Sequence, residues 1–289
     1  MAAVHDRVAL TGWRAAWTWG IGIALAHRIL LTVWLALVWS VVGAHLGSIR
    51  IDFHTANAQL PTLTTPLEQN AFGVWRRWDA VHYLDLAVNG YRLDNAGATV
   101  FSLLTPFTFR AADALLPGNI DLAAAVVETI AFSAALALLY RVVELLYHDE
   151  ALARWSVALL ALMPVSFFFA APMSESIHLA FVLAFFYYAL KDRWAVASLM
   201  GFCATLARSQ GAFLVGAGLL LIIERCGLPP REWLDIYLRP VIRRAVWLAI
   251  IPLAMLIFLA YRVCFNLPPI DEIYTHYSYA FFVNPVEAV

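Results

Sequence analysis

The sequence predicts an all-α, polytopic membrane protein that forms a single domain over residues 1–289. Of these residues, 63% are hydrophobic and only 13% are charged, whereas about 25% of the residues of a soluble domain carry a charge. The mean hydropathy is +0.75. Several apolar runs approach the roughly 20 residues that a helix needs to cross ~30 Å of hydrocarbon. No internal repeat divides the chain, so these runs predict one helical membrane domain.

Composition also narrows the partners and cofactors. The formal net charge is -1 at pH 7 and the basic residues are spread along the chain, so we predict no nucleic-acid partner. Cys203, Cys226 and Cys264 show no Cys-x-x-Cys spacing and predict neither a zinc site nor a disulfide framework. The carboxylates lack the regular spacing of a divalent-metal site, although Asp79 could share an ion with another carboxylate through the fold. We predict no metal and no cofactor.

We predict about seven membrane spans, bounded by charged or turn residues. The first apolar run is long and lacks a cleavage site of small residues, so it reads as a retained helix rather than a secretory signal. Several runs are short for a full crossing, which suggests helices buried among others or broken near a cavity. The predicted spans are residues 17–47, 120–147, 155–171, 177–190, 194–206, 212–223 and 245–265.

The basic residues beside these spans predict their orientation. If the spans alternate, one face collects most of the arginines and is cytoplasmic. The opposite, extracytoplasmic face then carries a first outer loop, residues 48–118, and the stretches APMSES and ARSQG. We read residues 100–117 of this loop as interfacial or re-entrant. The chain ends soon after the seventh span, which fits a short protein or a fragment. Outer-face arginines run against the charge bias and indicate a local task such as holding phosphate: Arg50, Arg76, Arg77, Arg92 and Arg110.

The stretch WRRWDAVHYLDLAVNGY, residues 75–91, is the densest polar and aromatic cluster. On a helix, Asp79 and His82 would share one face, and Trp75, Trp78 and Tyr83 would roughly share another. A partly buried Asp79 would suit a general base. The alternative is an amphipathic helix in the headgroup layer that tryptophans and arginines anchor.

Two further stretches carry candidate site residues. In PMSESIH, Ser174 and Glu175 begin a span, where they would either cap the helix or bind a sugar hydroxyl. In ARSQG, Arg208 and Gln210 end a span. The Arg208 guanidinium would either grip a phosphate with two hydrogen bonds or reach toward the lipid headgroups.

The string RWDAVHYLDLAVNGY resembles the Trp-Asp-x-x-His-Phe/Tyr motif, followed by Ala-x-x-Gly-Tyr, of the GPI mannosyltransferase 2 family, also called the PIG-V family. Further along, SES resembles the family's Tyr-Ser-Glu-Ser, and LARSQG resembles its Thr-Arg-x-x-Gly. Three matches in the same order are more specific than any one of them. They fall on Trp78, Asp79, His82, Tyr83, Ala87, Gly90, Tyr91, Ser174, Glu175, Ser176, Arg208 and Gly211.

The resemblance implies an integral membrane glycosyltransferase of the GT-C type, with interfacial helices in its first outer loop. Such an enzyme takes mannose from a polyprenyl-phosphate (dolichyl-phosphate-type) donor outside the cytosol and passes it, with inversion, to a lipid-linked or glycan acceptor. Membrane lipids are its partners. An aspartate in the first outer loop acts as general base, and this role falls on Asp79.

We therefore predict Asp79 and His82 as the catalytic residues. Asp79 deprotonates the acceptor hydroxyl, and His82 orients Asp79 or contacts phosphate. Arg208 holds the leaving phosphate and Glu175 binds sugar hydroxyls. The predicted substrate- and phosphate-binding residues are Arg208, Gln210, Glu175, Ser174, Trp78, Tyr83 and Arg77.

Two other classes of function stay open at this point. The polar outer cluster could be the vestibule of a lipid or solute transporter, but the chain has no paired, broken helices in matching halves. The second class is a non-catalytic membrane subunit with the same fold. The acceptor, the linkage and any protein partner are left open by the sequence.

Overall fold

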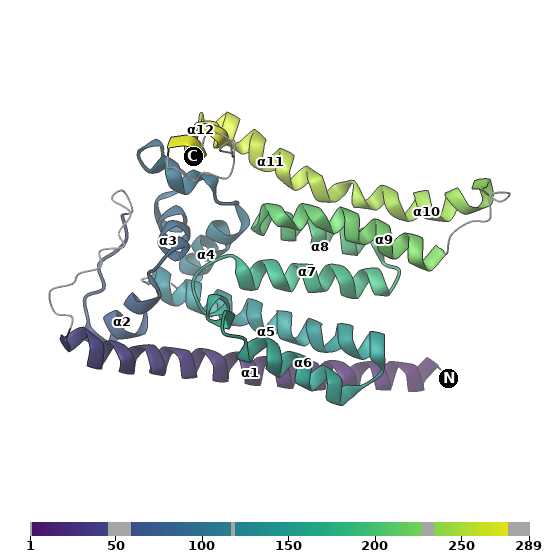
Figure 1. Cartoon of the computed structure of the whole chain (residues 1–289), viewed down its shortest axis with the longest axis horizontal. Helices are drawn as coiled ribbons and strands as arrows, with labels where there is room; N and C mark the ends of the chain where they lie inside the picture. Colours follow the sequence, from purple (N-terminus) through teal and green to yellow (C-terminus); the bar gives the residue numbers. More distant parts are fainter. Residues whose placement is uncertain (1, 46–58, 117–118, 227–233, 277–289) are drawn as a thin grey trace, which may run out of the picture.

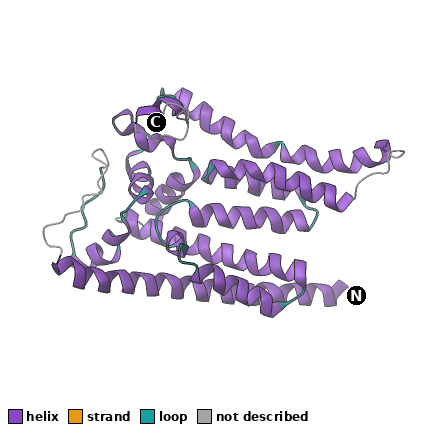
Figure 2. Ribbon diagram, in the orientation of Figure 1, coloured by secondary structure: helices purple, strands orange, loops and turns teal. Residues whose placement is uncertain are grey.

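The computed structural model describes residues 2–45, 59–116, 119–226 and 234–276. Over these ranges the regular elements are all helices, and no strand occurs among them (Figure 2). The predicted all-α class is thus confirmed.

Long helices lie along the long axis of the molecule (Figure 1). The neighbouring pairs are α1 with α5, α5 with α7, α7 with α8, and α8 with α11. Large apolar side chains cover much of the outer surface, including Leu30, Leu220 and Val263, as expected where lipid is the solvent. The bundle consists of α1 (Ala2–His45), α5 (Ile120–Tyr147), α6 (Glu150–Leu162), α7 (Glu175–Leu190), α8 (Trp194–Ala207), α9 (Leu214–Cys226), α10 (Leu234–Leu248) and α11 (Ile250–Cys264).

Four stretches of the described chain are long and apolar enough to cross a membrane: Gly12–Val38, Ile120–Tyr147, Ser209–Cys226 and Pro240–Cys264. Two shorter apolar helices, α7 and α8, lie inside the bundle beside them. The chain is therefore an integral membrane protein with several spans. Each predicted span contains a helix, whereas the number of crossings stays a prediction.

The predicted span at residues 155–171 is wrong in its bounds. Helix α6 ends at Leu162, and a short 3₁₀ helix, η3 (Ser166–Phe169), follows it. Met163 is extended, with φ -60° and ψ 140°, because the ring of Pro164 disfavours helical geometry in the residue before it. The chain therefore turns at this point instead of continuing across the bundle.

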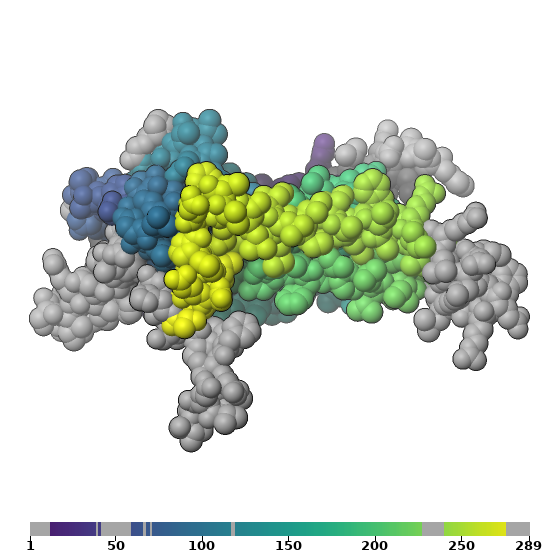
Figure 3. All heavy atoms as spheres, turned by 90° about the horizontal axis from the view of Figure 1, so that it is seen from above, coloured from purple at the N-terminus to yellow at the C-terminus, as the bar shows by residue number. Residues whose placement is uncertain are grey.

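The described part of residues 48–118 folds into short helices at one end of the bundle, the end opposite the N-terminus (Figure 1). Figure 3 shows α12 against this part of the chain. The segment that we predicted to be interfacial or re-entrant forms α4, whose 12 residues are too few for a crossing. The elements at this end are α2 (Pro66–Ala71), η1 (Gly73–Trp75), α3 (Asp79–Asn89), η2 (Leu93–Val100), α4 (Leu104–Leu115) and α12 (Ile270–His276).

Candidate active site

Helix α3 begins at Asp79 because the backbone breaks just before it. Trp78 has φ 49° and ψ -135°, outside helical geometry, and η1 ends at Trp75. The prediction that Trp75, Trp78 and Tyr83 share a helical face is therefore wrong. Asp79 stands in the first turn, where a carboxylate compensates the unpaired N–H groups. Its side chain is exposed, so the partial burial that we expected of Asp79 as a general base is not found. The helix start presents this carboxylate to the outside.

The rest of α3 is embedded in protein rather than lying on a surface. Ala80, Leu84, Leu86 and Ala87 are all almost fully buried. Arg110 of α4 binds the helix end, since its Nε donates to the carbonyl of Ala87 at 2.6 Å. An amphipathic helix in the headgroup layer would expose one face, so that alternative does not describe α3.

The Trp78 side chain packs beside two phenylalanine rings. It is 60% exposed, and its ring centroid lies 5.6 Å from that of Phe167 and 6.0 Å from that of Phe168. Both phenylalanines belong to η3, which the early end of α6 brings to this position. The aromatic run of η3 is thus a component of the site that sequence reasoning missed, although the run SFFF after Pro164 was a visible signal.

His82 stacks on Phe101, with ring centroids 5.2 Å apart. Burial lowers the pKa of this imidazole, while the nearby charges of Asp79 and Asp85 act in the opposite direction. His82 Nδ1 is buried without a hydrogen-bond partner among the described residues. In the described structure His82 makes no hydrogen bond to Asp79, so it does not orient Asp79 through a direct bond.

Tyr83 joins α3 to the start of α7. Its hydroxyl donates to Ser174 Oγ at 2.9 Å, and burial raises its pKa above the ordinary value, which keeps it protonated. Ser174 makes no capping bond to the helix N-terminus. The prediction that Ser174 caps the helix is therefore wrong.

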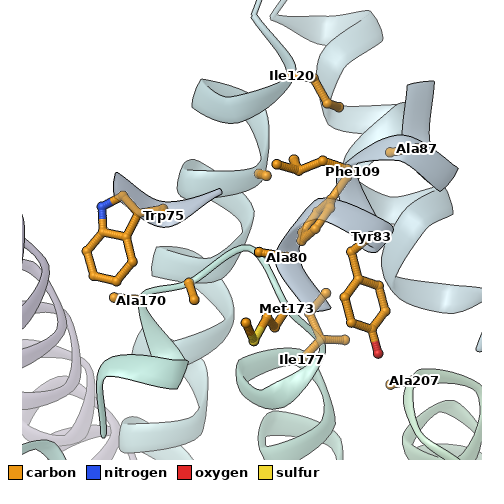
Figure 4. Close-up of a cluster of buried hydrophobic side chains, with 13 residues drawn as sticks. Trp75, Ala80, Tyr83, Ala87, Phe109, Ile120, Ala170, Met173, Ile177 and Ala207 are labelled. Atoms are coloured by element: carbon orange, nitrogen blue, oxygen red, sulfur yellow. The ribbon is translucent and has the colours of Figure 1, made fainter. Parts of the chain in front are cut away.

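Glu175 and Arg208 form an ion pair between the start of α7 and the end of α8. The charges of Arg208, Glu175 and Asp79 all act on the Tyr83 hydroxyl. Figure 4 shows that hydroxyl directed toward Ala207, the residue before Arg208. Three segments far apart in sequence thus meet around Tyr83.

Gln210 lies beyond this pair. It belongs to η4 (Ser209–Phe213) and is exposed. The turn that carries it is tight, since a Cβ on Gly211 would lie 2.4 Å from the backbone nitrogen of Thr205. Glycine is therefore needed at this position.

Two of the arginines that we predicted on the outer face form ion pairs within the fold. Arg76 donates to Asp121 of α5 at 2.6 and 2.8 Å, and Arg92 contacts the buried Asp85. Both arginines thus bind carboxylates of the fold, and phosphate binding by either of them stays a prediction. Asp85 also accepts from Asn89 and Asn95. Arg50 lies outside the described residues.

Arg77 and Trp78 lie in the wall of a cavity of about 910 Å³ between α1 and the α6–η3 segment. Side chains of α1, including Leu30 and Val38, form one side, and Ala158 and others of α6 form the opposite side. The cavity depends on the turn after α6, so its position was not predictable, although the short apolar runs suggested helices broken near a cavity.

The comparisons with known proteins identify the family of the chain. A family model described as "Mannosyltransferase (PIG-V)" matches residues 24–265. GPI mannosyltransferase 2 of Schizosaccharomyces pombe is 27% identical over 212 residues, which are 69% of this chain and 43% of that protein. The chain spans less than half the length of this relative. No solved structure matches. Because the family model matches well over half of it, the chain belongs to the PIG-V mannosyltransferase family.

Proposed function

We propose that the protein transfers mannose from a polyprenyl-phosphate donor to a hydroxyl of a lipid-linked or glycan acceptor, as a GT-C-type enzyme. One observation carries the proposal. Asp79, Glu175 and Arg208 come from three separate segments and converge on the Tyr83 hydroxyl at one end of the bundle. Two carboxylates and a guanidinium near one exposed helix start can supply a general base, a ligand for a sugar hydroxyl and a cation for the leaving phosphate, which is the set that this transfer needs.

In the proposed reaction Asp79 acts as general base. The acceptor oxygen forms a bond to the anomeric carbon and gives its proton to the Asp79 carboxylate. The bond between that carbon and the phosphate oxygen breaks on the opposite side, so the configuration inverts and polyprenyl phosphate leaves with the electron pair. An acceptor can reach Asp79 because its side chain is exposed, and the helix behind it is buried and fixed.

The Glu175–Arg208 pair would serve the donor. Each side chain is partly exposed, with 32% of Arg208 and 24% of Glu175 accessible, so a sugar phosphate can reach both. We assign the leaving phosphate to the guanidinium of Arg208 and a sugar hydroxyl to Glu175. We further propose that transfer occurs on the extracytoplasmic side and needs no metal or cofactor.

The test is transfer of radiolabelled mannose from polyprenyl-phosphate mannose to a membrane-lipid extract, in reconstituted vesicles. Asp79→Asn is compared with Asp94→Asn, which alters an aspartate of η2 that is also exposed and that pairs with Arg92. We expect Asp79→Asn to lose transfer by about 100-fold or more and Asp94→Asn to keep it. Full turnover by a folded Asp79→Asn variant would refute the mechanism. Lipid flux without transfer would instead indicate a transporter.

A further inference from the structure

A second pocket lies at the end of the bundle away from the candidate active site. Helix α7 begins at Glu175 and α8 ends beside Arg208, whereas this pocket is formed where α8 begins and by the facing part of α10 (Figure 1). Its volume is about 950 Å³. The 14 residues of α8 separate the two ends by about 21 Å. The pocket is therefore separate from the site around Tyr83.

Among the described residues, three arginines and a single carboxylate line this pocket. The carboxylate of Asp192 is already paired. Arg244 donates to both of its oxygens, at 2.7 and 2.8 Å, and the indole N–H of Trp194 donates to it at 2.6 Å. Arg225 also lies 3.9 Å from it. An anion that enters the pocket thus meets a carboxylate whose charge is balanced by arginines.

The other two arginines of the lining are Arg193, just before α8, and Arg243, on α10. Both side chains are exposed, and neither forms a hydrogen bond or an ion pair with any part of the chain that the structure describes. Two guanidiniums that line one cavity repel each other, and an anion between them removes this cost. A guanidinium also presents a planar set of N–H donors that matches the oxygens of a phosphate. The pocket therefore has the charge and the donors for a phosphate group.

The pocket adjoins an apolar surface. Trp247, which is 43% exposed, and Val196 both line it. Leu199 follows Val196 by three residues on α8, which places it on the same helical face, and it is 48% exposed. Tryptophan is typical of the headgroup level of a membrane, and exposed apolar side chains beside it contact lipid tails. This surface favours a phosphate that carries hydrocarbon chains over a water-soluble one.

We propose that this pocket binds the phosphate group of an anionic phospholipid. The phosphate lies between Arg193 and Arg243, and the acyl chains pass along Leu199. Basic pockets between membrane helices suit such head groups. Because the two arginines belong to different helices, the bound lipid joins α10 to α8. Mannose transfer plays no part in this binding, so a failed transfer assay would leave it standing.

The first experiment measures binding in detergent. Phosphatidylglycerol with brominated acyl chains is titrated against the protein, and brominated phosphatidylcholine is the neutral comparison. Quenching of tryptophan fluorescence is recorded, and the part of it that Trp247→Phe removes reports binding at the pocket. We expect phosphatidylglycerol to bind about ten-fold more tightly than phosphatidylcholine. Equal affinity for the two lipids would overturn the proposal.

The double variant Arg193→Gln/Arg243→Gln should lose this preference. Folding should not depend on either side chain, because both are exposed and unpaired in the described structure. The matched control is Arg14→Gln/Arg154→Gln, which removes the same charge from exposed arginines of α1 and α6 that do not line the pocket. We expect the control to keep the preference. An equal loss in both double variants would show attraction to the basic surface in general and contradict the proposal.

The second experiment separates a lipid from a soluble phosphate. Inorganic phosphate and glycerol 3-phosphate are added as competitors at the concentration of the brominated phosphatidylglycerol, and we expect neither to displace it. Displacement by either would overturn the assignment to a lipid. Saturating phosphatidylglycerol should also raise the unfolding temperature by about 3 °C or more in the unaltered protein and the control, but not in Arg193→Gln/Arg243→Gln. An unchanged unfolding temperature would contradict a lipid that joins α10 to α8.

Discussion

Tyr83 of α3 donates a hydrogen bond to Ser174 at the start of α7, 2.9 Å away and 91 positions along the chain. Ser174 is fully buried and Tyr83 is 5% exposed. This bond fixes the helix that carries Asp79 to the helix that carries Glu175. The bond therefore helps to hold the base and the donor-binding side in position, together with the apolar cluster that α3 and α7 share.

We expect Tyr83→Phe and Ser174→Ala each to lower the free energy of unfolding by about 1 kcal/mol, because each removes one partner of a buried hydrogen bond. The double variant should cost less than the sum of the two. Thermal unfolding in detergent measures the cycle. Strict additivity would contradict a direct bond between the two side chains.

The ion pair between Glu175 and Arg208 predicts that replacing Arg208 by lysine lowers turnover. In Arg208→Lys the charge stays, but the planar fork that can hold both a carboxylate and a phosphate is lost. We expect kcat to fall about 100-fold with little change in the KM for the acceptor. The control is Arg225→Lys, an arginine at the end of α9, whose Nη2 donates to the Leu190 carbonyl. A variant that melts early but turns over normally would assign Arg208 to structure alone.

His82 predicts a dependence of stability on pH. Burial lowers its pKa in the folded protein from the ordinary 6.5, so the unfolded chain binds more protons as the pH falls below about 6.5. Stability should fall on acidification through this range. Melting temperatures between pH 7.5 and pH 5 test this, with His82→Asn expected to flatten the curve and His148→Asn, at an exposed histidine, expected to leave it unchanged. An unaltered slope in His82→Asn would count against the assignment.

Gly211 and Gly216 form a matched pair for the turn that carries Gln210. A Cβ on Gly211 would meet the backbone of Ala204 and Thr205, whereas a Cβ on Gly216 would have nothing within 4 Å. We expect Gly211→Ala to destabilise the protein by about 1–3 kcal/mol. Gly216→Ala, inside α9, should stabilise it by up to about 1 kcal/mol. Unfolding in denaturant measures both, and a neutral Gly211→Ala would show that the turn can relax.

The parts of the fold that follow from local chemistry were predictable. The span at residues 120–147 coincides with α5, because Asn119 caps the helix through bonds to the N–H groups of Asp121 and Leu122. The early end of α6 was visible in Pro164, but a hydropathy run passes over a single proline. The break at Trp78 was not predictable, since its positive φ depends on tertiary contacts.

The site was predictable as a set of residues but not as an arrangement. Asp79, Glu175 and Arg208 stood out by residue type and motif, while their meeting around Tyr83 depends on contacts between distant segments. Phe101 and the phenylalanines of η3 could hardly be recognised as site residues from the sequence, because apolar aromatic residues abound in every span. The Nη1 of the buried Arg262 donates to the carbonyl of Thr99. Nothing in the sequence distinguished this arginine from the others.

Two hydrogen bonds join α1 to η3 and to the residue that follows it, and we expect them to couple the site to the thickness of the bilayer. His27 pairs with Ser166 at 3.0 Å, and Arg28 donates to the carbonyl of Ala170 at 2.8 Å. A helix tilts when its apolar length exceeds the local hydrocarbon thickness. Tilt of α1 would therefore shift η3, the rings under Trp78 and the entrance to Asp79 together. We expect mannose transfer to vary with the acyl length of the host lipid, and to vary less in His27→Leu, where one of the two bonds is gone.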